Sequence, residues 1–139
     1  MPPHPLKTYL VEDSRVIRDN LIATLEELVP AEVVGVAEDE ATAVQWLTAP
    51  QHTAELVIID IFLKGGSGLG VLRALQDQLP RRRLVVLSNY TTAEMRRKCL
   101  ALGADRVFDK SYDIDALIAY CTQLQLATGA AGATGSARS

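Results

Sequence analysis

The chain has 139 residues, of which 48% are hydrophobic, and a formal net charge of -3. This size supports one well-buried core, so we expect a single domain over residues 1–127. Acidic and basic residues are mixed along the chain, which argues against a nucleic-acid-binding surface. No apolar run approaches the roughly 20 residues that cross a bilayer, and no secretory signal is present, so we expect a cytoplasmic protein without membrane contact.

Short apolar runs alternate with longer stretches of helical period, which indicates βα units around a parallel sheet. The expected strands cover residues 6–11, 33–37, 56–60, 84–88 and 105–109. Several of these runs are apolar throughout, as strands are when helices cover both faces of their sheet. The pattern therefore predicts an α/β fold with helices between the strands.

Apolar residues at helical spacing predict the core faces of three helices. The stripes are Ile17, Leu21, Leu25 and Leu28; Leu69, Leu72, Leu75 and Leu79; and Ile114, Leu117, Ile118, Cys121 and Leu124. Ser14 can cap the first helix, and residues 91–94 (TTAE) predict a capping box that opens the fourth. Cys99 and Cys121 have no metal-binding spacing, so we expect reduced, buried thiols. The small and polar residues 128–139 predict a disordered Gly/Ala/Ser tail.

Polar residues stand at the carboxyl ends of four predicted strands, where open parallel sheets bind ligands. They are Glu12, Asp13, Asp60, Ser88 and Lys110. Three carboxylates placed so closely would repel one another unless a cation lay among them, and hard oxygen ligands suit Mg²⁺. A carboxylate nucleophile beside a metal, a lysine and a hydroxyl is what phosphoryl transfer to an aspartate requires. Taken singly, each residue has an ordinary structural explanation, and the signal lies in their combination.

The sequence resembles the receiver domain of two-component response regulators over about residues 6–126. The resemblance rests on EDS at 12–14, IID at 58–60, Gly68, LS at 87–88, GAD at 103–105 and DKS at 109–111. It implies a flavodoxin-like (βα)5 three-layer sandwich whose parallel strands follow the order 2-1-3-4-5. It also implies a signalling phosphoacceptor, rather than an enzyme, that catalyses its own phosphorylation and dephosphorylation.

By this resemblance, Asp60 accepts a phosphoryl group from a histidine kinase or a histidine phosphotransfer protein. Ser88 would hydrogen-bond the phosphoryl group, and Lys110 would pair with it. The implied ligands of Mg²⁺ are the carboxylates of Glu12, Asp13 and Asp60 and the main-chain carbonyl of Phe62. The phosphorylated form would bind a downstream protein, or form a homodimer, through the face of the fourth helix, fifth strand and fifth helix.

Several positions depart from the family pattern, among them Val107, Ser111 and Asn89, which stands after the hydroxyl residue where a small residue is usual. Val107 stands where receivers usually carry an aromatic residue whose rotamer follows the hydroxyl. This leaves Tyr90 and Phe108 as candidate side chains that report switching. Ser111 follows Lys110, where most receivers have a proline, so no cis peptide is expected there.

Three uses of such a domain remain open. A stand-alone receiver would bind a partner protein when phosphorylated, and the absence of a helix-turn-helix or enzymatic segment after residue 126 favours this use. A phosphorelay intermediate would pass the group from Asp60 back to a histidine of another protein. The chain could also be the receiver part of a DNA-binding transcription factor. The basic residues at 81–83 and 96–98 are more typical of solvated surface than of a nucleic-acid site, so no direct nucleic-acid binding is expected.

Overall fold

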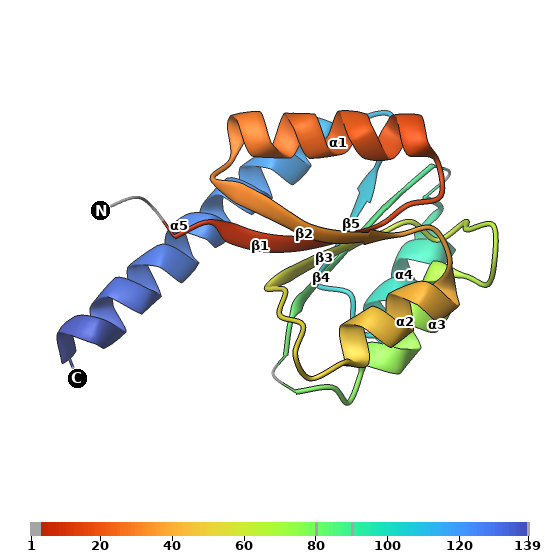
Figure 1. Cartoon of the computed structure of the whole chain (residues 1–139). Helices are drawn as coiled ribbons and strands as arrows, with labels where there is room; N and C mark the ends of the chain where they lie inside the picture. Colours follow the sequence, from red (N-terminus) through yellow and green to blue (C-terminus); the bar gives the residue numbers. More distant parts are fainter. Residues whose placement is uncertain (1–3, 80, 90, 139) are drawn as a thin grey trace.

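The computed structural model is a parallel sheet with helices on both faces (Figure 1), described over residues 4–79, 81–89 and 91–138 and for side chains up to Thr128. The strands are β1 Leu6–Val11, β2 Ala31–Ala37, β3 Leu56–Ile59, β4 Arg83–Ser88 and β5 Arg106–Asp109. The helices are α1 Arg15–Leu28, α2 Glu40–Thr48, α3 Gly68–Leu75, α4 Ala93–Ala101 and α5 Ile114–Arg138. The strands follow the order β2-β1-β3-β4-β5, which confirms the predicted flavodoxin-like topology.

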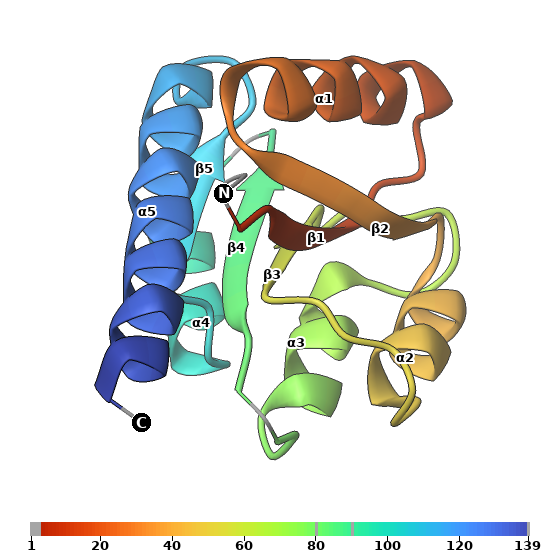
Figure 2. The ribbon, with the colours of Figure 1, turned by 60° about the vertical axis from the view of Figure 1, so that its left-hand side comes forward.

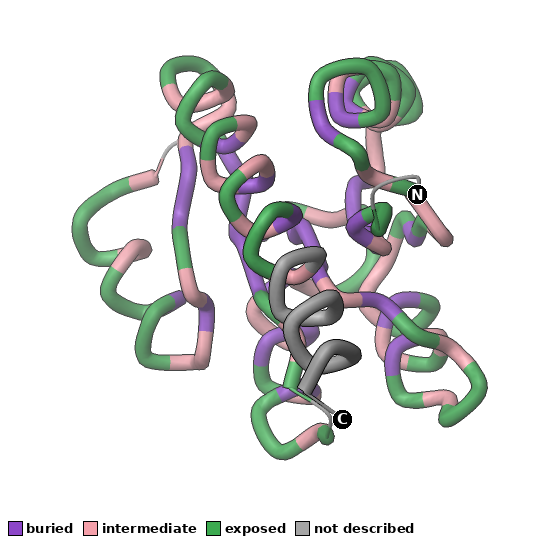
Figure 3. Tube along the Cα trace, turned by 90° about the vertical axis from the view of Figure 1, so that its left-hand side faces the viewer, coloured by how far each residue is buried: buried purple, intermediate pink, exposed green. Residues whose placement is uncertain are grey.

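The sheet separates two hydrophobic clusters. Helices α1 and α5 cover one face, and α2, α3 and α4 cover the other (Figures 1 and 2). Successive strand residues point to opposite faces, so Leu10 packs toward α1 and α5 while Tyr9 and Val11 pack toward the other three helices. Strand β3 lies between β1 and β4 and is buried at every position, which explains why its sequence is apolar throughout. Buried residues gather along the strands in the middle of the molecule (Figure 3).

The predicted helix faces pack against the core except at both ends of the α1 stripe and at the last residue of the α3 stripe. Leu21 and Leu25 of α1 are buried, whereas Ile17 and Leu28, in its first and last turns, are exposed. Leu79 is 81% exposed because α3 ends at Leu75 and its side chain is not part of the helical face. A periodic pattern therefore locates the core side of a helix better than it locates its termini.

The helix caps differ in one respect from the prediction. The Ser14 hydroxyl accepts a hydrogen bond from the Ile17 N–H at 3.3 Å, as expected for the cap of α1. Helix α4 is capped by Thr92, whose hydroxyl accepts from the Met95 N–H at 3.1 Å, so the predicted cap at Thr91 is wrong by one residue. The Thr91 hydroxyl is used elsewhere, as described below.

Both cysteines are buried free thiols, as predicted. Cys99 lies in the cluster beneath α4 and Cys121 in the cluster beneath α5, on opposite faces of the sheet. Helix α5 continues to Arg138, and the side chains of residues 129–139 lie outside the described part, so the disordered tail remains a prediction. Within the described residues, none of the helices is both long and apolar enough to cross a bilayer.

An aromatic stack joins β1 to α2. The rings of Tyr9 and Trp46 lie 4.2 Å apart between centroids, and the rings of Trp46 and His52 are also separated by 4.2 Å. The position of Gly35 on the neighbouring strand leaves room for the Tyr9 ring, which a Cβ at residue 35 would crowd. The stack packs α2 against β1.

Candidate active site

Asp60 comes directly after β3, at the carboxyl edge of the sheet. Its N–H donates to the Val11 carbonyl at 2.9 Å, which continues the β1–β3 ladder to this residue. The side chain is only slightly exposed and both carboxylate oxygens are occupied. The Ser88 hydroxyl donates to Oδ1 at 2.9 Å, and the Lys110 ammonium donates to Oδ2 at 2.8 Å. The structure therefore brings together the residues that end β3, β4 and β5.

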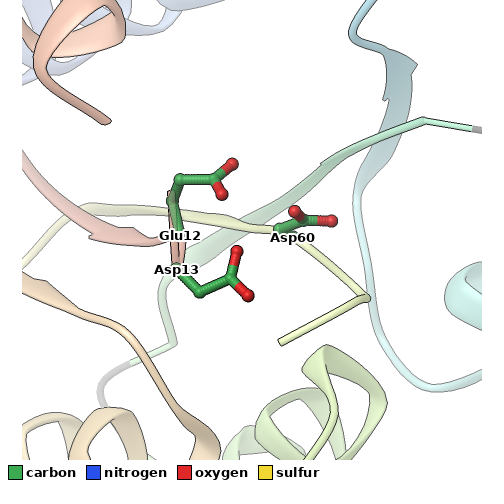
Figure 4. A group of neighbouring side chains, drawn as sticks. All are labelled: Glu12, Asp13 and Asp60. Atoms are coloured by element: carbon green, nitrogen blue, oxygen red, sulfur yellow. The ribbon is translucent and has the colours of Figure 1, made fainter. Parts of the chain in front are cut away.

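Two further carboxylates follow β1. Glu12 and Asp13 lie beside Asp60, and each of the three offers an oxygen within 4.8 Å of the others (Figure 4). Glu12 is buried, with 2% of its surface exposed, and its Oε2 accepts the Ser14 N–H at 3.0 Å. The predicted convergence of the three acids at one edge of the sheet is thus present in the structure.

Lys110 joins two of these carboxylates. Its Nζ lies 2.6 Å from Glu12 Oε1 and 2.8 Å from Asp60 Oδ2. Its main-chain N–H donates to the Ser88 carbonyl at 3.1 Å. Burial acts to lower the pKa of Lys110, but the hydrogen bonds and charges of Asp60 and Glu12 outweigh burial and raise it above its ordinary value. Burial raises the pKa of Glu12, and the negative charge of Asp60 acts in the same direction against the opposing lysine.

The donor set fits a hard divalent cation. Three carboxylates and one ammonium leave the cluster with surplus negative charge, and oxygen ligands at one open edge are what Mg²⁺ and Ca²⁺ bind. The cluster shows where a metal would be held. Its composition does not select one divalent cation over another.

The loop after Asp60 approaches that residue closely. The Phe62 N–H donates to Asp60 Oδ1 at 3.2 Å, and the Gly68 N–H donates to the Ile61 carbonyl at 2.9 Å. A Cβ at Gly68 would collide with the main-chain oxygen of Asp60, so glycine is required for this turn. The Phe62 side chain is 56% exposed, and the role of its carbonyl as a metal ligand stays a prediction.

Val107 and Phe108 of β5 lie on opposite faces of the sheet. Val107 packs into the cluster beneath α4, whereas Phe108 packs on the opposite face, 6.0 Å from the Tyr120 ring between centroids. Phe108 therefore does not replace an aromatic residue at position 107. Tyr90 lies outside the described residues.

Arg96 occupies the space beside Val107 in a way that the sequence did not reveal. Its Nη1 donates to the Val107 carbonyl at 2.8 Å, its Nη2 donates to the Thr91 hydroxyl at 3.3 Å, and it pairs with Asp113 at 3.5 Å. Thr91 in turn donates to Asp109 Oδ2 at 3.1 Å. The expectation of a solvated basic residue at position 96 is wrong, because nothing in the local sequence shows these distant partners.

The family model for the response regulator receiver domain matches residues 9–122. The chain belongs to this family. A receiver domain is a signalling phosphoacceptor that works with histidine kinases, rather than an enzyme in the usual sense. The acidic cluster of Glu12, Asp13 and Asp60 is consistent with the active site of such a receiver.

The chain is also similar to a transcriptional activator. The chain is 29% identical over 99 residues to the DNA-binding transcriptional activator DevR/DosR of Mycobacterium tuberculosis. The matched residues make up 71% of this chain. The chain spans less than half of the activator's own length, 45%.

Solved structures support the fold. The receiver domain of Francisella response regulator 1452 superposes with a TM-score of 0.77 at 23% identity, over 90% of this chain and 99% of that one. A response regulator of Burkholderia pseudomallei, solved with a phosphorylated aspartic acid, a calcium ion and citrate, gives a TM-score of 0.72 at 22% identity, over 93% of this chain and 74% of that one.

Proposed function

We propose that Asp60 of this receiver accepts a phosphoryl group from a phosphohistidine of a histidine kinase or a histidine phosphotransfer protein. The observation that carries the proposal is the buried Asp60 carboxylate, which lies against the Ser88 hydroxyl, the Lys110 ammonium and two further acids. In the transfer, an Asp60 oxygen forms a bond to phosphorus, the phosphorus–nitrogen bond breaks, and the imidazole leaves. The product is an acyl phosphate.

The side chains around Asp60 suit the charge that such a transfer places there. The Lys110 ammonium and the Ser88 hydroxyl are donors already directed at the carboxylate, so they can donate to phosphoryl oxygens with little rearrangement. A donor that is in place before the reaction lowers the barrier more than one that must be reoriented. The same residues would support self-catalysed loss of the phosphoryl group.

Mg²⁺ is the metal that we propose for the acidic cluster. Glu12, Asp13 and Asp60 would supply carboxylate oxygens, and Phe62 would supply its main-chain carbonyl. When bound, such an ion neutralises negative charge on the transferring phosphoryl group. Without a cation, the negative charge of the three acids would repel an anionic phosphoryl donor.

The signal would leave the site through the face of α4, β5 and α5, as the resemblance implies. Ser88 ends β4, and the segment after it leads to Thr91, which contacts β5 through Asp109 and α4 through Arg96. Phosphorylation would therefore bias the arrangement of this face between two states, one of which a downstream protein or a second copy of the chain prefers. We expect this to take place in the cytoplasm.

The experiment is phosphorylation by a small donor followed by intact-mass measurement. The protein is incubated with acetyl phosphate or phosphoramidate and Mg²⁺, alongside Asp60→Asn and the control Asp77→Asn, an exposed acid without a partner among the described residues. We expect one added phosphoryl group in the wild type and in the control, none in Asp60→Asn, and none with EDTA. Equal phosphorylation of Asp60→Asn would exclude Asp60 as the acceptor.

A second candidate is that this chain is the receiver part of a longer transcription factor. The relative from Mycobacterium tuberculosis is named a DNA-binding transcriptional activator, and the match covers less than half of it. In that case the α4–β5–α5 face would control a DNA-binding domain of the same polypeptide. The mass of the protein purified from its natural source, compared with 15.1 kDa for this chain, distinguishes the two candidates.

A further inference from the structure

Glu40, the first residue of α2, contacts the loop that follows Asp60 from both its main chain and its side chain. Its N–H donates to the Gly65 carbonyl at 2.9 Å, and its Oε1 accepts the Ser67 N–H at 2.9 Å. Ser67 is the last residue of the loop and caps α3, which begins at Gly68. The start of α2 is therefore attached to the far end of this loop at two points.

The backbone of the loop and of α3 is shaped to admit this side chain. At Gly66 and Gly70, an added Cβ would collide with atoms of Glu40, and at Gly70 all three nearest atoms belong to its carboxylate. Glycine in the first turns of a helix is unfavourable compared with alanine. Any side chain with a Cβ at position 70 would have to displace the Glu40 carboxylate.

The same loop carries a group that contacts Asp60. Phe62 and Ser67 form an antiparallel bridge across the loop, so fixing Ser67 also fixes Phe62. The Phe62 N–H donates to Asp60 Oδ1 at 3.2 Å. A chain of direct contacts thus runs from the Glu40 carboxylate through Ser67 and Phe62 to Asp60. Helices α2 and α3, at whose first turns this chain begins, lie side by side (Figures 1 and 2).

We propose that Glu40 is a positioning residue for the phosphorylation site. It holds the loop of residues 61–67 so that the main chain of Phe62 stays against Asp60 and at the metal-binding cluster. Because the inference concerns that site, it rests on the proposed function. Without the Glu40 carboxylate the loop loses an acceptor at its far end, so the main chain at Phe62 moves more freely and binds a metal less well.

The test is a double-mutant cycle between Glu40 and Gly70, with two readouts. The first is hydrogen exchange of the Ser67 and Phe62 amides measured by NMR without metal. The second is the dissociation constant for Mg²⁺ measured by calorimetry. Glu40→Ala should speed exchange at both amides and raise the Mg²⁺ dissociation constant by about tenfold, the lower end of the effect of removing groups that orient metal ligands. Glu40→Gln keeps an acceptor oxygen and should restore most of the affinity.

Gly70→Ala should mimic Glu40→Ala, because the new Cβ displaces the carboxylate. In the Glu40→Ala background the collision partner is absent, so Gly70→Ala should add less than about a twofold change, as expected for two residues that act through one contact. Glu27→Ala, which removes an exposed acid of α1 without a partner among the described residues, is the charge control and should change neither readout.

The outcomes separate this inference from the proposed function. Unchanged amide exchange in Glu40→Ala, or Mg²⁺ binding that is unchanged while the wild type binds the metal, would overturn the role of Glu40 alone. Additive effects of Glu40→Ala and Gly70→Ala would do the same. Failure of the wild type to bind Mg²⁺ or to accept a phosphoryl group would overturn the proposed function, and the loop attachment would then be judged by amide exchange.

Discussion

The ammonium group of Lys110 contacts two buried carboxylates at once, and this makes it the residue on which the charge balance of the site depends. The sequence placed Lys110 at the edge of the sheet because it follows β5 directly, and it placed Glu12 and Asp60 there for the same reason. It could not show that the lysine bridges both acids, since that depends on the direction of three side chains. A strand pattern locates where a residue leaves the sheet, and packing decides what its side chain contacts.

Replacing Lys110 with glutamine should leave two buried carboxylates without their cation. We expect Lys110→Gln to lower the free energy of unfolding by about 3 kcal/mol in EDTA, in the range found when one member of a buried ion pair is removed. Mg²⁺ should stabilise the variant more than it stabilises the wild type, because the ion takes over part of the neutralisation. Urea unfolding with and without Mg²⁺ measures both effects.

The control for this prediction is Lys98→Gln, at an exposed position of α4 with no ion pair within the described residues. It should change the free energy of unfolding by less than about 0.5 kcal/mol. A loss in Lys110→Gln as small as that of the control would contradict the charge argument.

At the scale of elements, Arg96 connects three segments that the sequence presents separately. Its guanidinium joins the segment before α4 at Thr91, strand β5 at the Val107 carbonyl, and the residue before α5 at Asp113. These are the elements of the proposed output face. With valine at position 107, the α4 side of β5 has no aromatic ring, and a hydrogen-bonded arginine on α4 links the described parts of this face.

Arg96→Gln should lower the free energy of unfolding by about 1–2 kcal/mol, because it removes hydrogen bonds to a main-chain oxygen and a hydroxyl as well as an ion pair. Arg97→Gln is the matched control, since Arg97 is exposed and makes no hydrogen bond or ion pair within the described residues. We expect the control to stay within about 0.5 kcal/mol of the wild type in urea unfolding. Equal effects of the two variants would show that the Arg96 contacts contribute nothing.

How well the sequence predicts each strand, helix cap or contact depends on whether the residues that form it are close together in the sequence. All five strands were predicted, within two residues at each end. Strand β3 is buried at every position and is therefore marked by its apolar residues alone, whereas the start of β2, an edge strand that is mostly not buried, was misplaced by two residues. The cap of α4 was misplaced by one residue because Glu94, three residues after Thr91, gives the pattern of a capping box. In the structure Thr91 contacts Asp109 and Thr92 caps the helix. Glu40 was not predicted at all, since its partner Ser67 is 27 residues away and the contact forms only when α2 packs beside the loop.

For the whole molecule, two groups buried on opposite faces of the sheet predict a loss of stability in alkali. Burial raises the pKa of Tyr9 to about 12 and the pKa of Cys121 to about 12. The folded state therefore keeps both protons as the pH rises above the ordinary values of 10.0 and 9.0, whereas the unfolded chain releases them. The free energy of unfolding should fall from about pH 9 up to pH 12, by at most about 1.4 kcal/mol per pH unit for each group.

Urea unfolding between pH 7 and pH 11 tests this prediction. Cys121→Val removes a titrating group and should flatten the decline above pH 9. Tyr9→Phe should flatten it above pH 10 and should also raise stability near neutral pH, because the Tyr9 hydroxyl is buried and makes no hydrogen bond among the described residues. A decline of equal slope in both variants and the wild type would assign the alkaline loss to other groups.

The aromatic stack on α2 gives the protein an optical property. Trp46 is the single tryptophan of the sequence, and it lies between the Tyr9 ring of β1 and the His52 ring beyond α2. Tryptophan emission from the native protein therefore comes from one location, in the helix whose first residue contacts the loop after Asp60. The tryptophan fluorescence of the unlabelled chain is thus a local signal from α2.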